Sequence, residues 1–269
     1  MSFNSLSFAV FFPFVVLFFF VLPRRICWGW LLLASYVFYA AYLPVFLLLL
    51  WTSTLFDYFA ARAIDGQPVA RKRRQWLVLS LVVNLGLLAG FKYGGFLAQT
   101  VSMVSAWMGG SPASSRALAD VVVPIGISFY TFQTMGYVVD VFRGTCRAEK
   151  NLLRFALYVA YFPQLVAGPI ERAARLMPQL VTRSPFSLER CRDGLLLMSW
   201  GFFKKLVIAD RAALLADPVF SAPALASSAS AWLGLYAFSI QIYADFSGYT
   251  DIARGASRIL GIGLSENFK

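Results

Sequence analysis

Long apolar runs alternate with clusters of basic residues along the first part of the chain. Leu6 to Leu22 forms the first run, which is rich in phenylalanine, and two arginines follow it. A cleaved signal peptide has its basic residues before the apolar stretch and small residues after it, so this order predicts a membrane helix that is retained. Trp28–Tyr42 and Leu43–Ala61 predict two shorter helices with a hinge near Pro44.

The basic residues predict how these segments are oriented. Arg71–Arg74 is the densest basic cluster, which by the positive-inside rule belongs in the cytoplasm, against anionic lipid. Trp76–Leu97 is then expected to cross outward, and Thr100–Asp120, which contains one basic residue, to form an external connection. Membrane helices on both sides of the cluster disfavour a DNA-binding role for it.

Val121–Phe142 is expected to return toward the cytoplasm, with the sequence VVVPIGISFYTFQTMGYVVDVF. Pro124 and Gly126 predict a loosened helix, whose freed carbonyl groups must be satisfied by protein or water. Tyr130 and Gln133 add polar groups within the same short span. Two interpretations stay open here: ordinary hydrogen bonding between helices, or a broken helix that lines a polar cavity.

Shorter segments rich in arginine follow. Leu152–Gly168 has basic residues on both sides and is expected to dip into the membrane and return. Arg172–Arg192 predicts an amphipathic, interfacial stretch whose arginines reach lipid phosphates. Gly194–Ile208 is expected to cross outward, and Ala222–Ser230 to form an external loop of small residues.

The last stretch, Tyr236–Lys269, begins as an apolar helix that contains polar residues at unexpected positions. Gln241, Asp245 and Tyr249 follow one another at i, i+4 and i+8, so they share one helix face. A carboxylate at membrane depth costs roughly 2.5–3.5 kcal/mol on insertion scales. These side chains are therefore expected to face protein, water or a positive partner.

Asp251 belongs to another face of this helix, where Arg254 and Arg258 can reach it. A buried polar seam that locks helices together is one interpretation of these residues, and the lining of a functional tunnel is the other. Tyr130, Gln133, Gln241 and Asp245 are expected to face one shared protein interior. The candidate lining residues are Tyr130, Gln133, Gln241, Asp245, Tyr249 and Asp251.

Composition agrees with a membrane protein. The 269 residues are 59% hydrophobic and 14% charged, with a mean hydropathy of +0.67. We therefore predict an all-α, polytopic protein of about seven to nine membrane segments, some short, broken or re-entrant. Residues 1–269 form a single transmembrane domain in this interpretation, with no soluble domain. The net charge of +11 lies mainly between apolar runs, which indicates cytoplasmic loops and no nucleic-acid partner.

Metal and histidine chemistry find no support in these residues. The three cysteines, Cys27, Cys146 and Cys191, are scattered without metal-binding spacing. The chain contains no histidine, so histidine cannot act as base, proton shuttle or metal ligand within it. We expect no metal site and no bound cofactor.

Several sequence blocks, taken together, resemble the membrane-bound O-acyltransferase family in its alginate O-acetylase-like branch. They occur in the order of that family and cover essentially the whole chain. The blocks are PIGISFYTFQ (Pro124–Gln133), YVVDVFRG (Tyr137–Gly144), YFPQLVAGPIER (Tyr161–Arg172), GFFKKLVIAD (Gly201–Asp210) and QIYADFSGYTDIARGASRILGIGLSENF (Gln241–Phe268).

The resemblance implies a fold and an activity. The fold would be part of a helical ring around a thin centre in the bacterial inner membrane, crossed by a tunnel. The activity would be transfer of an acyl group, expected to be acetyl, from a cytoplasmic donor across the membrane to an exported polysaccharide such as alginate. Acetyl-CoA is the candidate donor. The implied partners are the lipid bilayer, a periplasmic acetyltransferase and the polysaccharide export machinery.

One departure from the family affects the mechanism. In the family, the block that matches SENF is followed by segments that contain the histidines, whereas this sequence stops at Lys269. We therefore expect an N-terminal fragment that is inactive by itself, and we assign no catalytic residue. A membrane transporter or channel, and a non-catalytic scaffold subunit of a polysaccharide export complex, remain the alternatives.

Overall fold

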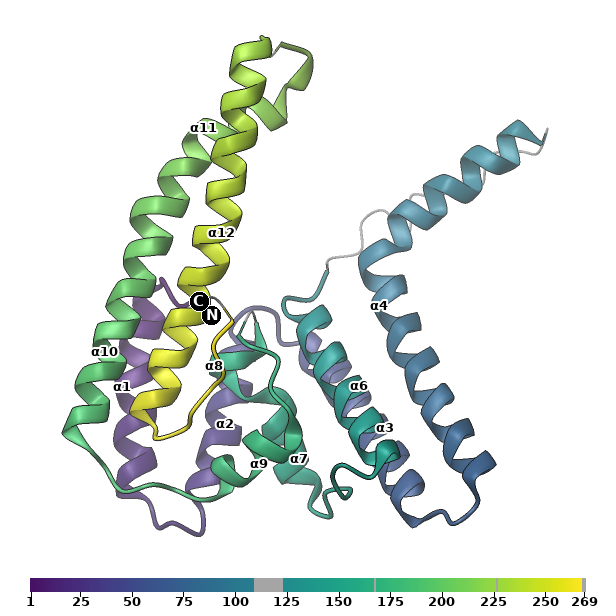
Figure 1. Cartoon of the computed structure of the whole chain (residues 1–269), viewed down its shortest axis with the longest axis vertical. Helices are drawn as coiled ribbons and strands as arrows, with labels where there is room; N and C mark the ends of the chain where they lie inside the picture. The colour runs from purple at the N-terminus through teal and green to yellow at the C-terminus, as the bar shows by residue number, and fades with distance from the viewer. Residues whose placement is uncertain (109–122, 167, 226, 268–269) are drawn as a thin grey trace.

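A computed structural model describes residues 1–108, 123–166, 168–225 and 227–267, and these residues form helices and connecting segments without a strand (Figure 1). The first group of helices is α1 (Leu6–Val21), α2 (Cys27–Ala40), α3 (Phe46–Gly66), α4 (Ala70–Trp107) and α6 (Ile127–Arg143). The second group is α7 (Leu152–Ala160), α8 (Phe162–Leu165), α9 (Ala173–Val181), α10 (Leu188–Phe203), the π-helix η1 (Lys204–Ala209), α11 (Asp210–Ser221), the 3₁₀ turn η2 (Pro223–Leu225) and α12 (Ser228–Ile259).

The body of the molecule is held together by aromatic side chains. On α1 the residues Phe8, Phe12, Val15 and Phe19 are buried, at spacings that place them on one face of a helix. Phe38 of α2 and Phe162 of α8 meet the same cluster, with ring centroids 5.5 Å apart. Such pairs add stability beyond the area that they bury. The core therefore joins α1 and α2 to α8, which lies more than a hundred residues later in the sequence.

A three-helix unit of α3, α4 and α6 forms one side of the body. Its centre contains the carboxylate of Asp57, which is completely buried. Ser80 donates a hydrogen bond to Asp57 Oδ1 at 2.7 Å, and Asn84 Nδ2 donates to both carboxylate oxygens at 2.8 and 3.0 Å. These bonds tie α3 to α4 by buried polar groups.

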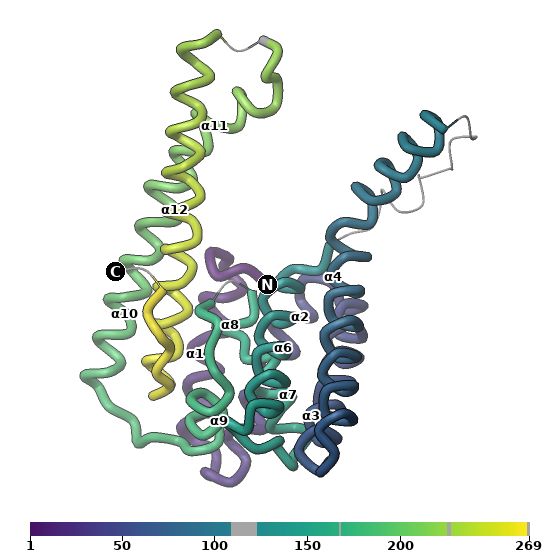
Figure 2. The backbone as a smooth tube through the Cα atoms, turned by 45° about the vertical axis from the view of Figure 1, so that its right-hand side comes forward, coloured from purple at the N-terminus to yellow at the C-terminus, as the bar shows by residue number. Residues whose placement is uncertain are grey.

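A long hairpin, which we call the arm, forms the other side: α10, η1 and α11 run up against α12 (Figures 1 and 2). Glycines allow the helices on the two sides of the arm, α10 and α12, to touch. A Cβ atom added at Gly201 would lie 2.6 Å from the carbonyl oxygen of Gly248, and one added at Gly255 would lie 2.5 Å from that of Gly194. Close backbone contact through small residues is a common way to associate membrane helices.

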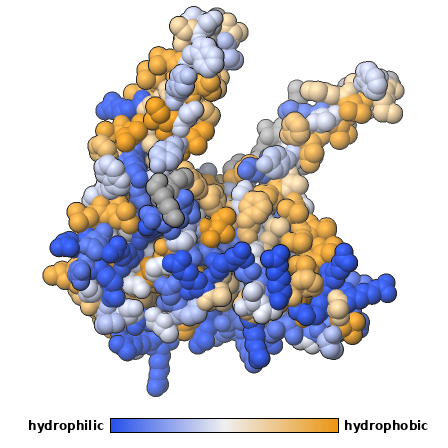
Figure 3. All heavy atoms as spheres, viewed as in Figure 1, coloured by the Kyte–Doolittle hydropathy of each residue, from blue (hydrophilic) through white to orange (hydrophobic). Residues whose placement is uncertain are grey.

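Basic residues gather at one end of the molecule, which we call the basic end. The turns α1–α2, α3–α4, α6–α7 and α9–α10 all lie there, at the bottom of Figures 1 and 2. In the space-filling view the hydrophilic surface is concentrated at this end, and apolar surface dominates above it (Figure 3). The tip of the arm points the opposite way.

Two of the described helices are long and apolar enough to cross a membrane by themselves, Phe46–Gly66 and Ala70–Trp107. Leu6–Val21 and Cys27–Ala40 are shorter apolar helices. The expectation of an all-helical fold is confirmed for the described residues, and these two helices are compatible with a membrane protein. The number of membrane segments stays a prediction.

Some predicted boundaries need correction. The external connection does not begin at Thr100, because α4 continues as a helix through Trp107; residues 109–120 of that connection lie outside the described residues. Pro124 and Gly126 do not break a helix either, since both precede α6. The Arg71–Arg74 cluster forms the first turns of α4 instead of a loop.

Candidate functional site

Three of the sequence blocks meet at a break between two short helices. The helix α7 ends at Ala160 and α8 begins at Phe162, on either side of Tyr161. Pro163 follows, and because proline has no N–H it cannot continue the hydrogen bonding of α7. With nine and four residues, these helices are too short to span a bilayer. A segment that dips into the membrane and returns, as expected here, needs short helices of this kind.

Side chains from other helices satisfy the backbone groups that this break frees. In an unbroken helix the N–H of Phe162 would donate to the carbonyl of Tyr158. Instead, Phe162 N–H donates to Ser35 Oγ of α2 at 3.2 Å, and Gln133 Nε2 of α6 donates to the Tyr158 carbonyl at 2.8 Å. Gln133, a predicted lining residue, therefore has a structural partner.

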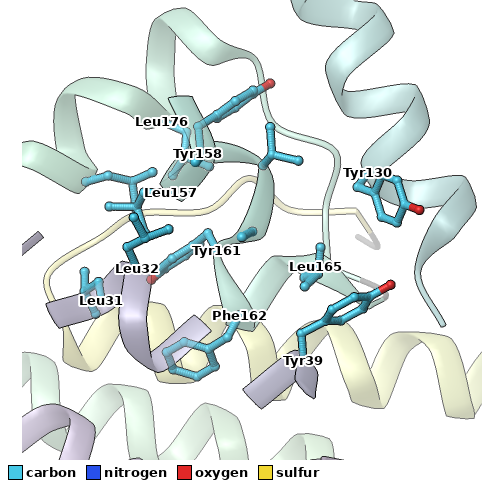
Figure 4. Packing of buried hydrophobic residues seen from close by; sticks show 14 of the residues in the cluster. Leu31, Leu32, Tyr39, Tyr130, Leu157, Tyr158, Tyr161, Phe162, Leu165 and Leu176 are labelled. Atoms are coloured by element: carbon cyan, nitrogen blue, oxygen red, sulfur yellow. The ribbon is translucent and has the colours of Figure 1, made fainter. Parts of the chain in front are cut away.

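The start of α6 lies directly against α8 (Figure 4). Gly126, just before α6, has φ of +76°, in the left-handed region that glycine adopts at no steric cost. A Cβ atom at this position would lie 2.5 Å from the Leu165 carbonyl oxygen. The glycine is thus required both by its backbone conformation and by the close approach of α8.

A cavity of about 340 Å³ opens beside this contact, at the end of α2 away from the basic end. Tyr39 lies in its wall and donates a hydrogen bond to the Ile125 carbonyl at 3.2 Å. The amino group of Met1 donates to the Phe38 carbonyl at 3.0 Å, and burial lowers its pKa. The cavity is lined by Met1, Ser2, Phe38, Tyr39, Ala41, Tyr42, Ile125, Val166 and Tyr249.

Two buried polar side chains in the same blocks have no hydrogen-bond partner among the described residues. They are the hydroxyl of Tyr130 and the amide of Gln164, whose residues are 1% and 2% exposed. An unpaired buried polar group costs about 1–3 kcal/mol. These groups are therefore available to hydrogen-bond a water molecule, a ligand or a further protein segment.

A second polar cluster lies on the arm, around η1. Lys204 Nζ is 2.7 Å from Asp251 Oδ2 and donates to Ser247 Oγ at 2.8 Å. Lys205 Nζ lies between two carboxylates, 2.7 Å from Asp245 and 3.0 Å from Asp210. A short π-helix within an α-helix often marks a functional position. Here it turns the two adjacent lysines toward carboxylates on α12.

The predicted residues do not form one site. Tyr130 and Gln133 are buried in the body, and Tyr249 lines the cavity, where its ring stacks on Phe3 at 4.5 Å. Asp245 is instead on the arm, with its side chain 51% exposed, and Gln241 is half-buried one turn away. A single shared interior is therefore not what this structure shows, although α6 and α12 do meet through Phe129 and Phe246.

Asp251 is buried, and a buried carboxylate needs a positive partner. Arg254 reaches it at 3.4 Å, as expected, but the shorter contact comes from Lys204. Arg258 does not reach it and pairs with Asp193 of α10 at 2.7 Å. The reason is the tight packing of α10 along α12, which brings residues of one helix to the charges of the other.

Among the described residues, sequence reasoning missed three buried acids: Asp57, Asp140 and Glu171. Asp140 is 7% exposed and pairs with Arg172 at 2.6 Å. Asp57 was a detectable signal, because it is a lone carboxylate within a long apolar segment. Glu171 is 4% exposed, accepts a hydrogen bond from the Ser265 N–H and pairs with Arg175 at 3.8 Å. Its position within an arginine-rich stretch suggested a surface residue, so the sequence contained no warning of its burial.

Comparison with known proteins gives these features a context. No protein-family model matches the chain. The chain is 40% identical over 239 residues to the probable alginate O-acetylase AlgI of Pseudomonas aeruginosa. The aligned residues cover 88% of this chain and 45% of that relative. The predicted resemblance to the alginate O-acetylases is confirmed.

Further relatives are also acyltransferases by name. The chain is 35% identical over 266 residues to the peptidoglycan O-acetyltransferase of Helicobacter pylori, covering 89% of this chain and 49% of that protein. It is 28% identical over 150 residues to the teichoic acid D-alanyltransferase of Bacillus subtilis, covering 54% and 37% respectively. The chain thus spans about half the length of the alginate O-acetylases and the peptidoglycan O-acetyltransferase that it matches.

Proposed function

We propose that this chain is part of a membrane-bound O-acyltransferase that acetylates an exported polysaccharide such as alginate. The observation that supports this most directly is the 40% identity to an alginate O-acetylase across 88% of the chain. The meeting of three sequence blocks at the α7–α8 break adds structural support: Gly126 approaches Leu165, and Tyr161 donates a hydrogen bond to Ser257 at 3.1 Å.

The acetyl group is proposed to come from a cytoplasmic donor, with acetyl-CoA as the candidate, and to leave on the other side. The basic end would face the cytoplasm of a multi-pass protein in the bacterial inner membrane, in keeping with the positive-inside rule. The cavity beside Tyr39 opens away from that end. A periplasmic acetyltransferase and the polysaccharide export machinery are the proposed partners.

These 269 residues are proposed to build the surroundings of the reaction and not to supply its base. Acyl transfer to a hydroxyl group needs a base near the nucleophile, with a pKa near the working pH. The chain has no histidine, and both acids considered as substitutes are engaged: Asp245 by Lys205 and Asp251 by Lys204, each at 2.7 Å. We therefore infer that the chain does not transfer acetyl groups by itself.

The test is complementation of a bacterium that exports its polysaccharide without O-acetyl groups. One strain receives the 269 residues, and another receives the reading frame continued past Lys269 to the length of the relatives. Immunoblots of isolated membranes check that both proteins are inserted. We expect O-acetyl groups on the polymer only with the longer protein, because general acid–base help alone is worth about 10²–10⁴ in rate.

Other outcomes separate the alternatives. Acetylation by the 269 residues alone would show that histidine is dispensable and would require Asp245→Asn and Asp251→Asn variants. A longer protein that inserts, yet restores no acetylation when the donor is supplied, would favour a transporter. A reading frame that stops at Lys269 and is needed only for complex assembly would favour a scaffold.

A further inference from the structure

The helix α4 packs on the rest of the protein with one side only. Ser80 and Asn84 lie on that side, where both bond to Asp57 of α3. Val78 and Val82 each lie two residues from Ser80, about 200° round the helix, and both are exposed. In Figure 1 this helix lies at the outer edge of the body. Because α4 is long and apolar enough to cross a membrane, its outer side needs a cover of lipid or protein.

A shallow groove, which we call the α4 groove, runs along this outer side. Three polar residues line its first part and three aliphatic residues the rest, all at the spacing of one helix face: Arg71, Arg74, Gln75, Val78, Leu79 and Val82. The step from Arg71 to Val82 rises roughly 16 Å along a helix. The hydrocarbon core of a bilayer is about 30 Å thick, so one leaflet contributes about 15 Å. The length of the groove therefore matches one leaflet, with the cations at one end.

The two arginines of the α4 groove have no negative partner. None of the ion pairs among the described residues includes Arg71 or Arg74, and both residues are exposed. Arg73, between them, is engaged instead: it donates to the Phe142 carbonyl at 2.8 Å and lies over the Phe142 ring. The first turn of α4 contains no acidic residue, so the positive end of the helix dipole adds to the charge of the arginines. An anion is therefore favoured at this end of the groove.

We propose that the α4 groove binds one anionic phospholipid. The two arginines hold the phosphate, whose oxygens match the fork of N–H groups on a guanidinium, and an acyl chain lies along the three aliphatic side chains. Lys72 and Arg73 take no part, because neither lines the groove. General attraction of a basic cluster to an anionic membrane would instead depend on charge alone, whichever side of the helix carries it. The inference does not depend on acyl transfer.

The first experiment separates a defined site from general attraction. Phosphatidylglycerol binding is measured by native mass spectrometry on the protein purified in detergent from its complete reading frame. A basic residue near an anionic lipid strengthens binding about fivefold, so Arg71→Gln combined with Arg74→Gln should weaken the tightest site roughly 25-fold. Lys72→Gln combined with Arg147→Gln is the matched control, because it also removes two positive charges from the basic end and neither residue lines the groove. The control should bind as the unmodified protein does.

Two results of this experiment would contradict the proposal. Equal weakening by the two double variants would show that the lipid responds to charge and not to a site. Equal affinity of the unmodified protein for phosphatidylglycerol and for phosphatidylcholine with the same acyl chains would show that the groove does not select an anion. Melting midpoints in detergent verify that each variant is folded.

The second experiment tests for the acyl chain. Leu79→Ser should weaken phosphatidylglycerol binding about fivefold, because the lipid then covers less apolar surface. Leu97→Ser is the control: Leu97 is 48% exposed against 44% for Leu79, lies further along α4 and does not line the groove. Glycerophosphoglycerol, the headgroup without acyl chains, should compete for the site only weakly. Competition as strong as that of the lipid would reveal an anion site that needs no acyl chain. Absence of bound phosphatidylglycerol from the unmodified protein would show that another protein segment covers the groove, and either result would overturn the proposal.

Discussion

At the scale of single residues, the buried carboxyl of Asp57 makes the sharpest prediction. Asp57→Leu leaves the buried Ser80 hydroxyl without its acceptor and leaves Asn84 Nδ2 with its bonds to Ser80 alone. A buried group without a partner costs about 1–3 kcal/mol, so the midpoint of thermal unfolding in detergent should fall clearly. Asp57→Asn should be better tolerated, because its oxygen can accept from Ser80 and its amide can donate to Asn84 once the Asn84 amide turns by about 180° to present Oδ1 in place of Nδ2.

The comparison of the two Asp57 variants contains its own control. Both remove the same ionisable carboxyl group, and they differ in the hydrogen bonds that the new side chain can make. Equal destabilisation by Asn and Leu would mean that the charge of Asp57, and not its hydrogen bonding, matters. Melting followed by size-exclusion chromatography after heating gives the required midpoints.

Residue types alone predicted that Asp245 and Asp251 need positive partners, and the structure supplies Lys205 and Lys204. The sequence could not identify these partners, because they lie 40 and 47 positions away and depend on how α10 and η1 pack along α12. Arg254 and Arg258 were the nearer candidates along the chain. Only one of them contacts Asp251, since the other is drawn to Asp193.

At the scale of the elements, the arm depends on its glycines. Gly201→Ala would place a Cβ atom 2.6 Å from the Gly248 carbonyl oxygen, so α10 and α12 must move apart. Overpacking of this kind typically costs about 1–3 kcal/mol, and the unfolding midpoint should fall. Gly90→Ala in α4 is the control, because a Cβ atom there meets nothing within 4 Å. The alanine should be neutral or stabilising by up to about 1 kcal/mol. A Gly201→Ala protein as stable as Gly90→Ala would show that the contact is not tight.

The apolar pattern predicted the early helices well, and it failed where turn chemistry mattered. Leu6–Leu22 matches α1 to within one residue, because a run of apolar side chains is itself the signal. Pro124 and Gly126 were taken as a break inside a helix, whereas they form the turn that precedes α6. A proline and a glycine are compatible with either arrangement. The close contact with Leu165 decides between them, and that contact is not local.

At the scale of the whole molecule, the sequence predicted the class and not the assembly. Apolar runs and basic clusters indicated a helical membrane protein, and the turns α1–α2, α3–α4, α6–α7 and α9–α10 lie at one end (Figure 1), where hydrophilic surface is concentrated (Figure 3). The meeting of α2, α6, α8 and α12 around the α7–α8 break could not be derived this way. It depends on bonds such as Ser35 to Phe162 and Tyr161 to Ser257, which join positions about a hundred residues apart.

The orientation of the whole molecule is the last prediction. Lys72, in the first turn of α4, lies at the basic end, whereas Ala229, at the start of α12, lies at the tip of the arm (Figure 1). The positive-inside rule places the basic end in the cytoplasm, so a membrane-impermeant thiol reagent on intact spheroplasts should label Ala229→Cys and spare Lys72→Cys.

The natural cysteines provide an internal control: Cys27 begins α2, Cys146 follows α6, and Cys191 lies in the first turn of α10, all toward the basic end. The unmodified protein should therefore stay unlabelled until the membrane is permeabilised, when Cys146 and Cys191, which are only partly buried, become reactive. Labelling of Lys72→Cys in intact cells, with Ala229→Cys protected, would reverse the orientation and with it the side from which the acyl donor is proposed to enter.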